Sequence, residues 1–376
     1  MSTAQLDASK LKIIRKEEPT VFEQNADFTF GRLFIDHMLV VEWKRESGWQ
    51  TPEIRPYGNL SLDPSACVFH YGFELFEGMK AYRTADGRVT LFRPDMNAAR
   101  MNRSAARVGL PQFDADQLVQ LIGKLVELDR QFVPQRPGYS LYIRPVMIGT
   151  SASLGVTAPD SALLYVIACP VGPYYKSGFS AVRLLATDNV TRAWPGGFGD
   201  KKLGGNYAPC IPSQEEAARL GYHQNLWLFG PEKYITEVGT MNAFFVFKDS
   251  ATGKKELVTA PLDGTILEGV TRDSVLTLAR ERLSPDEWDV SERYYTISEV
   301  AERAAKGEVV EAFGCGTAVV VSPIKEIGWN GQDIQVPLLP GEETGEFTKQ
   351  VAQWISEIQY GKVEYNNWSQ TIANLD

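Results

Sequence analysis

The chain has 376 residues, of which 44% are hydrophobic and 23% charged, and its formal net charge is −9 at pH 7. This ordinary globular composition excludes a disordered chain, and the length predicts two domains. The negative charge argues against nucleic acid or an anionic membrane as the main partner, and no apolar run reaches membrane-spanning length.

Cysteine and histidine are few in this chain, with four and three residues, and they are scattered along it. No CxxC pair occurs, and the three histidines, His37, His70 and His223, are far apart in sequence. Neither a metal site nor a histidine-based triad is therefore expected, and free thiols fit a reducing compartment. The first 25 residues are expected to be an irregular leader without a secretory segment. Because acids are interspersed with the basic residues, we expect the cytosol rather than the mitochondrion. The four cysteines are Cys67, Cys169, Cys210 and Cys315.

In the first half, the pattern predicts strands at 29–34, 38–43, 88–92, 140–148 and 162–169. It predicts one helix capped by residues 95–97 and a second from Asp114 to about Phe132. Pro and Gly residues near 172–180 then mark a linker. We therefore expect a first domain over 1–175, a linker over 176–181 and a second domain over 182–376, in a mixed α/β (α+β) protein.

The second half begins with a strand at 181–187 and leads into the stretch 196–207, where two lysines lie between two glycine clusters. Glycines let a backbone approach a ligand closely, and a lysine held there can form a Schiff base with an aldehyde. A flexible basic surface loop is the alternative. Further on, the pattern predicts a helix from Pro212, a hairpin of strands at 225–229 and 234–238, and a final helix at about 343–358.

Three other features could complement such a lysine. Glu237, on a predicted strand, could pair with a protonated ring nitrogen, or it could simply be an exposed strand residue. Residues 269–271 open a predicted helix, whose unpaired N–H groups suit a phosphate. Residues 314–317 are predicted as a tight turn between strands that could meet a second edge of the phosphate.

Two nucleotide-binding motifs are approached but not matched. Residues 314–319 begin like a dinucleotide fingerprint, but they end in Val and lead into a strand where a helix is needed. Residues 199–205 lack the GK[ST] of a P-loop. A nucleotide phosphate is therefore poorly supported, and so is a nicotinamide oxidoreductase.

Taken together, these motifs resemble a branched-chain amino-acid aminotransferase, a class IV (fold-type IV) pyridoxal-phosphate enzyme, in its eukaryotic and most nearly fungal cytosolic form. The likeness extends from about Leu6 to Trp368. It implies a smaller N-terminal α/β domain and a larger C-terminal pseudo-barrel domain that carries the Schiff-base lysine. The motifs that carry it are residues 36–39, 74–81, 141–145, 199–207, 235–242, 267–272 and 358–361.

The resemblance implies a role for each cofactor residue. Pyridoxal 5'-phosphate would be bound through Lys202, with Lys201 not catalytic, and would meet Tyr207 at its 3-oxygen and Glu237 at its ring nitrogen. Lys202 would then move a proton between Cα and C4′ of the reacting centre. The residues implied for the phosphate and its surroundings are Arg100, Leu267, Gly269, Val270, Thr271 and Thr317.

The resemblance also implies the substrates and the subunit arrangement. The amino group of L-leucine, L-isoleucine or L-valine would pass to 2-oxoglutarate by a ping-pong cycle, in branched-chain amino-acid biosynthesis. Arg144 would contact the distal carboxylate of glutamate or 2-oxoglutarate, and Thr240 and Ala318 would lie near the α-carboxylate. A homodimer would share its active sites through Tyr71, Leu154 and Val156. The remaining pocket residues would be Phe30, Phe76, Tyr142, Tyr174 and Tyr207, each of which could instead be a core aromatic.

One departure from the family concerns a redox CxxC that some eukaryotic members carry after the Thr-Ala pair. Val319 and Ser322 stand at those places, so thiol–disulfide regulation is not expected there. Three alternative functions stay open from sequence. They are a D-amino-acid aminotransferase or aminodeoxychorismate-type lyase of the same fold, a non-catalytic binding protein that kept the fold, and the nicotinamide oxidoreductase mentioned above.

Overall fold

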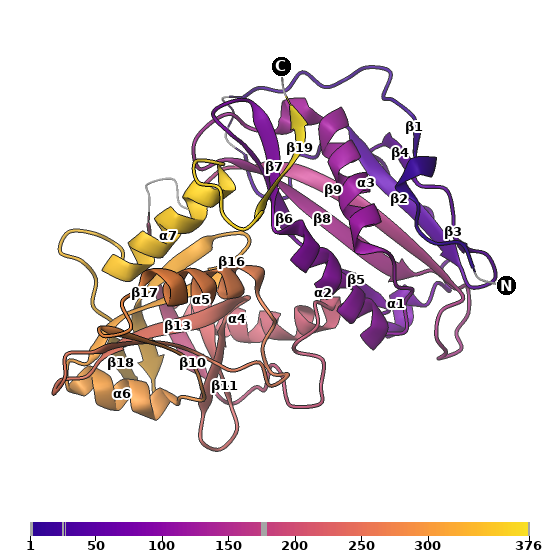
Figure 1. Cartoon of the computed structure of the whole chain (residues 1–376). Helices are drawn as coiled ribbons and strands as arrows, with labels where there is room; N and C mark the ends of the chain where they lie inside the picture. The colour runs from indigo at the N-terminus through magenta and orange to yellow at the C-terminus, as the bar shows by residue number, and fades with distance from the viewer. Residues whose placement is uncertain (1–2, 25, 27, 174–178, 375–376) are drawn as a thin grey trace. The chain divides into compact units, whose positions relative to one another are not determined.

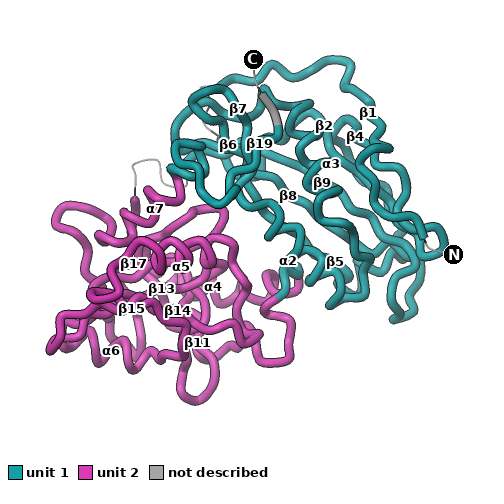
Figure 2. The backbone as a smooth tube through the Cα atoms, in the orientation of Figure 1, with its two compact units in different colours: residues 1–173, 201–204, 357–376 teal, residues 174–200, 205–356 magenta. Residues whose placement is uncertain are grey.

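The computed structural model describes residues 3–24, 26, 28–173 and 179–374. The chain divides into two compact units, coloured teal and magenta in Figure 2. The first unit contains residues 1–173, 201–204 and 357–376, and the second contains 174–200 and 205–356. The predicted linker at 176–181 begins among residues outside the described ranges, so the proposed domain boundaries stay a prediction.

A single sheet forms the frame of the first unit, with ten strands among the described residues. Its order is β1-β4-β2-β9-β8-β6-β7-β19, with β3 beside β2 and β5 beside β8. The long antiparallel pair of β8 and β9 lies at its centre. The strands are β1 (Lys12–Ile13), β2 (His37–Lys44), β3 (Gly48–Trp49), β4 (Glu53–Pro56), β5 (Glu74–Phe76), β6 (Met79–Arg83), β7 (Arg88–Phe92), β8 (Ser140–Gly149), β9 (Ser161–Val171) and β19 (Ser369–Asn374).

The helices of this unit include two long ones, α2 (Pro94–Arg107) and α3 (Ala115–Leu128), which pack on each other (Figure 1). The side chain of Asp114 caps α3 by accepting from the N–H groups of Asp116 and Gln117. The apolar stripe that predicted α3 is buried, and the helix contacts β2 and β19. The shorter helices are η1 (Ala8–Lys10), α1 (Val68–Tyr71) and η2 (Arg130–Phe132).

A sheet that closes on itself forms the second unit, in the order β12-β11-β10-β17-β16-β13 with a further pairing of β13 to β12. The pseudo-barrel that the resemblance implied is therefore present. The strands β14 and β15 extend it beyond β13, and β18 pairs with β17. The strands are β10 (Val182–Thr187), β11 (Gln224–Phe229), β12 (Tyr234–Val238), β13 (Met241–Lys248), β14 (Lys255–Thr259), β15 (Trp288–Glu292), β16 (Val309–Gly316), β17 (Val320–Trp329) and β18 (Gln332–Gln335).

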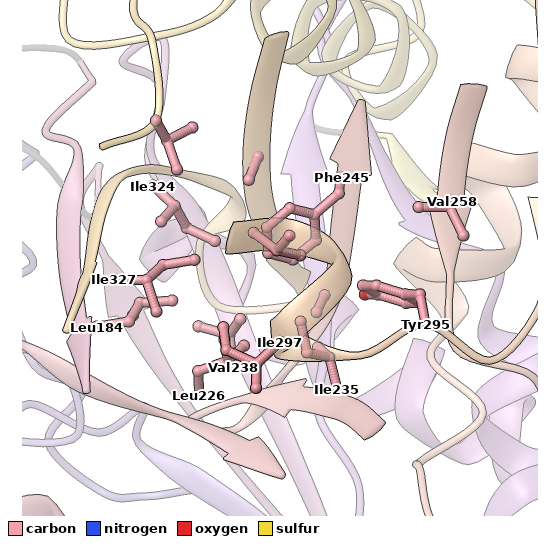
Figure 3. Close-up of a cluster of buried hydrophobic side chains, with 14 of the residues drawn as sticks. Leu184, Leu226, Ile235, Val238, Phe245, Val258, Tyr295, Ile297, Ile324 and Ile327 are labelled. Atoms are coloured by element: carbon pink, nitrogen blue, oxygen red, sulfur yellow. The ribbon is translucent and has the colours of Figure 1, made fainter. Parts of the chain in front are cut away.

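The core of the second unit consists of apolar side chains from this closed sheet together with others from outside it, among them Ile297 and Val300 of α6 (Figure 3). Leu184, Leu226, Phe245 and Ile324 are completely buried there. The helices α4, α5 and α6 pack against strands of this unit. No helix within the described ranges is long and apolar enough to cross a membrane. The remaining helices are η3 (Gly204–Asn206), η4 (Ala208–Cys210), α4 (Ile211–Arg219), α5 (Val270–Arg282), α6 (Ile297–Ala305) and α7 (Glu346–Gln359).

Most predicted elements are confirmed, but four local predictions are wrong. Residues 29–34 form turns rather than a strand, because Gly31 adopts a positive φ of 69° and Arg32 N–H bonds back to Thr29 O. The leader expected to be irregular contains η1 and β1. The helix α2 begins earlier than predicted, at Pro94 after a left-handed Arg93. The turn predicted at 314–317 lies at 317–319 instead, since β16 continues to Gly316.

Candidate active site

The backbone of Lys202 is held on both sides within the first unit. Phe76 N–H donates to Lys202 O (3.1 Å), and Lys202 N–H donates to the Ser104 hydroxyl oxygen (2.9 Å). The side chain extends so that Nζ lies 4.8 Å from the centroid of the Phe76 ring. The segment is therefore not a loose surface loop: it is fixed between β5 and α2, with its amine over an aromatic face.

Gly204 explains one of the glycines in the lysine motif. A Cβ atom at this position would lie 1.8 Å from Oε1 of Glu74, on β5. Any side chain there would push the lysine segment away from the strand, and Lys202 with it. This glycine is needed for close approach to β5, whereas the sequence analysis expected the glycines to allow close approach to a ligand.

Two predicted pocket aromatics surround the guanidinium of Arg144. Its Cζ lies 4.6 Å from the centroid of Phe76 and 5.2 Å from that of Tyr142, whose hydroxyl accepts from Nη2 (3.0 Å). The ring of Phe30 meets that of Tyr142 edge-on, with centroids 4.9 Å apart. Among the hydrogen bonds of the described residues, Nε of Arg144 has no partner although it is buried. This is an apolar surrounding with one cation suited to a carboxylate.

Arg100, predicted to contact a phosphate, is engaged in a buried ion pair with Glu77. Nε lies 2.7 Å from Oε1 and Nη2 lies 2.9 Å from Oε2, while Asn97 Nδ2 also donates to Oε2 (2.8 Å). Burial opposes ionisation of Glu77, but the adjacent Arg100 outweighs it and holds the pKa of that carboxyl below its usual value. Sequence reasoning missed Glu77, although it lies inside the motif at residues 74–81.

The residues predicted to serve a partner subunit lie on the surface. Tyr71, Leu154 and Val156 are 40%, 65% and 73% exposed, and the Tyr71 hydroxyl donates to Leu154 O (2.6 Å). Apolar side chains gathered in this way on a surface are typical of an interaction site. Tyr174, the remaining predicted pocket aromatic, lies outside the described residues.

In the second unit, Glu237 on β12 is buried, with 2% exposure, so it is not the exposed strand residue of the alternative interpretation. Its Oε1 accepts from Leu267 N–H (2.9 Å) and from Asn242 Nδ2 (3.3 Å). Its Oε2 lies 2.8 Å from Nη2 of Arg192. Contacts of this kind on both oxygens fix the direction of the buried carboxylate.

The helix α5 starts at Val270, as predicted, and its N-cap is Gly269. Glycine has no side chain to accept from the first-turn N–H groups, so the Val270 and Thr271 amides are not capped in that way. Both residues are buried. Thr317 and Ala318 lie in the turn between β16 and β17, within the same unit.

Tyr207 and Thr240 line a cavity of about 70 Å³ in this unit, together with Arg192 and Cys210. Burial raises the pKa of the Cys210 thiol, and its Sγ donates to Asn206 O (3.3 Å). A raised pKa lowers the fraction of thiolate, which is the nucleophilic form of a cysteine. Nowhere in the described part of the chain do three or more His, Cys, Asp or Glu residues gather in a way that could hold a metal ion.

Residues 74–327 match the family described as amino-transferase class IV. The chain belongs to this family.

Its relatives include the mitochondrial and cytosolic branched-chain-amino-acid aminotransferases of Saccharomyces cerevisiae. The chain is 69% identical to the first over 373 residues, covering 99% of this chain and 95% of that one. It is 67% identical to the second over 376 residues, covering both in full. The solved branched-chain amino acid aminotransferase of Escherichia coli has a TM-score of 0.70 at 25% identity, over 89% of this chain and 99% of that one.

Proposed function

We propose that the chain is a branched-chain amino-acid aminotransferase that moves the amino group between L-leucine, L-isoleucine or L-valine and 2-oxoglutarate. The observation that carries this proposal is the surrounding of Phe76, whose ring lies near both the amine of Lys202 and the guanidinium of Arg144. One small region thus offers an amine for proton transfer, an apolar surface for a branched side chain and a cation for a carboxylate. The identity of 67–69% to the two yeast enzymes supports the same assignment.

The cofactor in this proposal is pyridoxal 5'-phosphate, and the residues present fit it. A buried carboxylate fixed by three donors suits a protonated ring nitrogen, and a glycine-capped helix start suits a phosphate. When bound, the cofactor supplies an aldehyde that takes the amino group and a ring that accepts the electrons left at Cα. The residues that would hold it are Lys202, Tyr207, Glu237, Arg100, Leu267, Gly269, Val270, Thr271 and Thr317.

The chain's own residues then divide the work. Lys202 would remove the proton from the substrate Cα as a general base and deliver it to C4′ as a general acid. Glu237, held in place by Arg192, keeps the ring nitrogen protonated. Tyr142 fixes Arg144 through its hydroxyl, so that the guanidinium is already oriented when the distal carboxylate of glutamate arrives.

Binding of the apolar substrates is assigned to Phe30, Phe76 and Tyr142, with Thr240 and Ala318 at the α-carboxylate. The exposure of Tyr71, Leu154 and Val156 supports a homodimer in which these residues complete the partner's pocket. A cytosolic location is part of the proposal only, since the relatives include both a cytosolic and a mitochondrial form.

The test compares the two neighbouring lysines. Lys202→Ala should remove the visible absorbance of the Schiff base between protein and cofactor, because no amine remains to form it. It should also lower turnover of L-leucine with 2-oxoglutarate at least about 10³-fold, because it removes the group that moves the proton. Lys201→Ala, the matched control, should change both by less than about threefold. The measurements are the absorbance spectrum of the purified protein and a steady-state survey of amino donors.

Two outcomes would end the proposal. Activity with D-leucine but not L-leucine would favour the D-amino-acid aminotransferase of the same fold. A colourless protein whose spectrum and turnover do not respond to Lys202→Ala would favour a non-catalytic binding protein.

A further inference from the structure

We infer that Asn242 is a positioning residue that fixes the carboxylate of Glu237 and joins it to the segment leading into α5. This inference rests on the proposed function, since Glu237 is assigned to the ring nitrogen and the start of α5 to the phosphate. Asn242 itself is assigned no contact with cofactor or substrate. It would act through Glu237 and through the backbone at Leu267.

The hairpin of β12 and β13 places the two side chains together. Glu237 and Asn242 are directly opposite each other in the antiparallel register, and Val238 and Met241 close the turn over Gly239 and Thr240. Residues opposite each other across two strands project to the same face of the sheet. A two-residue turn therefore brings an amide against the carboxylate with no freedom of register.

The amide of Asn242 then connects two groups. Its Nδ2 donates to Glu237 Oε1 (3.3 Å) and to Leu267 O (2.9 Å). Leu267 N–H donates to the same Oε1 of Glu237 (2.9 Å). The carboxylate, the amide and the backbone N–H and C=O of Leu267 form a closed triangle of hydrogen bonds, so none of them can shift without breaking a bond to another.

Packing holds the amide from the other side. Asn242 is 4% exposed, and a Cβ atom at Gly269 would lie 2.0 Å from its Oδ1. The N-cap glycine of α5 thus lies directly against the amide, and its φ of −68° and ψ of 131° would suit any residue. Close approach to Asn242, rather than backbone conformation, is what requires glycine there.

The consequence is a rigid link between the two ends of the cofactor site in this unit. Glu237 is assigned to the ring nitrogen, and the start of α5 is assigned to the phosphate. Leu267, which leads into α5, lies 30 residues after Glu237 in sequence. Through Asn242 they belong to one hydrogen-bonded and packed cluster. A cofactor held at both ends is oriented by that cluster more strictly than by either contact alone.

The test is a double-mutant cycle on Asn242 and Gly269 in the full-length protein. Asn242→Ala should raise the Kd for pyridoxal 5'-phosphate about tenfold, because hydrogen bonds to a charged group are lost. Gly269→Ala should cause a similar rise, since its methyl group displaces the amide. The double variant should be no worse than Asn242→Ala alone, because the shortened side chain leaves room for the methyl group.

A second readout separates positioning from simple structural support. Asn242→Asp places a carboxylate against Glu237, with the Arg192 guanidinium as the nearby opposite charge. The added negative charge should raise the pH midpoint of the visible absorbance change of the bound cofactor. Asn102→Asp is the matched control, because the Asn102 amide likewise makes two hydrogen bonds, donating to Phe113 O and accepting from Phe113 N–H, with no carboxylate among its partners in these two bonds. It should lower Tm without moving the Kd or the pH midpoint.

Independent effects of Asn242→Ala and Gly269→Ala that multiply to about a hundredfold would overturn the inference. So would an Asn242 variant that lowers Tm like the control but leaves the Kd and the pH midpoint unchanged. In both cases an unaltered protein that binds the cofactor and turns over L-leucine leaves the proposed function intact. An unaltered protein that binds no cofactor overturns both.

Discussion

Each of the two units contains a buried glutamate that lies against an arginine, a side-chain amide and a backbone N–H. In the first unit, Glu77 meets Arg100, the amide of Asn97 and the backbone N–H of Gly78. In the second, Glu237 meets Arg192, the amide of Asn242 and the backbone N–H of Leu267. The likeness shows what a buried carboxylate requires: one cation and enough N–H donors for its remaining lone pairs.

The difference lies in how each arginine is used. Glu77 presents both carboxylate oxygens to Arg100, at 2.7 and 2.9 Å. Oε2 of Glu237 lies 2.8 Å from Nη2 of Arg192, and the amide contact of this glutamate is longer, at 3.3 Å. A two-bond pair between one arginine and one carboxylate is a strong and rigid fixture. The looser arrangement around Glu237 suits a carboxylate that also meets a ligand. Glu77 should therefore matter most for folding, and Glu237 for chemistry.

The largest effect should come from Glu77→Gln. Removing this charge leaves Arg100 buried without its counter-ion, which should lower the free energy of unfolding by about 3–5 kcal/mol. Urea denaturation followed by circular dichroism measures it. The control is Lys349→Ala, which breaks an exposed pair with Glu342 and should cost less than about 1 kcal/mol. Equal losses in the two variants would contradict the structural role given to Glu77.

Glu237→Gln should show the opposite balance. The amide keeps the shape of the side chain but loses the charge that stabilises a protonated ring nitrogen, so kcat/KM for L-leucine should fall about 10²-fold. The free energy of unfolding should fall by less than in Glu77→Gln, because the amide oxygen of the glutamine keeps the hydrogen bonds that Leu267 and Asn242 make to Oε1. Steady-state kinetics and urea denaturation of the same preparation give both numbers. A Glu237→Gln variant that loses as much stability as Glu77→Gln while keeping kcat/KM would remove the distinction between the two glutamates.

The sequence predicts the contacts of Glu77 and Glu237 only in part. Glu237 and Asn242 are separated by a Gly-Thr turn, so their cross-strand contact follows from local rules and could have been predicted. The Arg192–Glu237 and Arg100–Glu77 pairs depend on which distant segments the fold brings together, which no local pattern contains. Likewise the motif around Lys202 was recognisable, but its attachment through Ser104 and Phe76 was not. The missed turn at Gly31 is a local failure, since neighbouring aromatic and β-branched residues outweighed the glycine in the pattern.

Acidification should give the smallest effect on the free energy of unfolding, and this effect should be selective for Glu77. Arg100 holds the pKa of Glu77 below its usual value, so this pair stabilises the fold fully above the unfolded-state pKa near the reference value of 4.5. That stability is lost as the pH falls through the lower pKa of the folded state. The stability gap between the unaltered protein and Glu77→Gln should therefore narrow as the pH falls, by at most about 1.4 kcal/mol per pH unit.

The comparison of the two proteins isolates this group from others that titrate in the same range. The pKa of Asp129 is shifted in the opposite direction, because burial raises it despite the hydrogen bond with His37. Protonation of Asp129 in acid therefore favours the folded state of the protein. Asp129 is present in both proteins, so its contribution cancels in their difference. Urea denaturation at several values between about pH 6 and pH 3 measures the gap. A gap that stays constant across this range would mean that Glu77 has the same pKa in the folded and unfolded chains, and that Arg100 gives it no charge stabilisation.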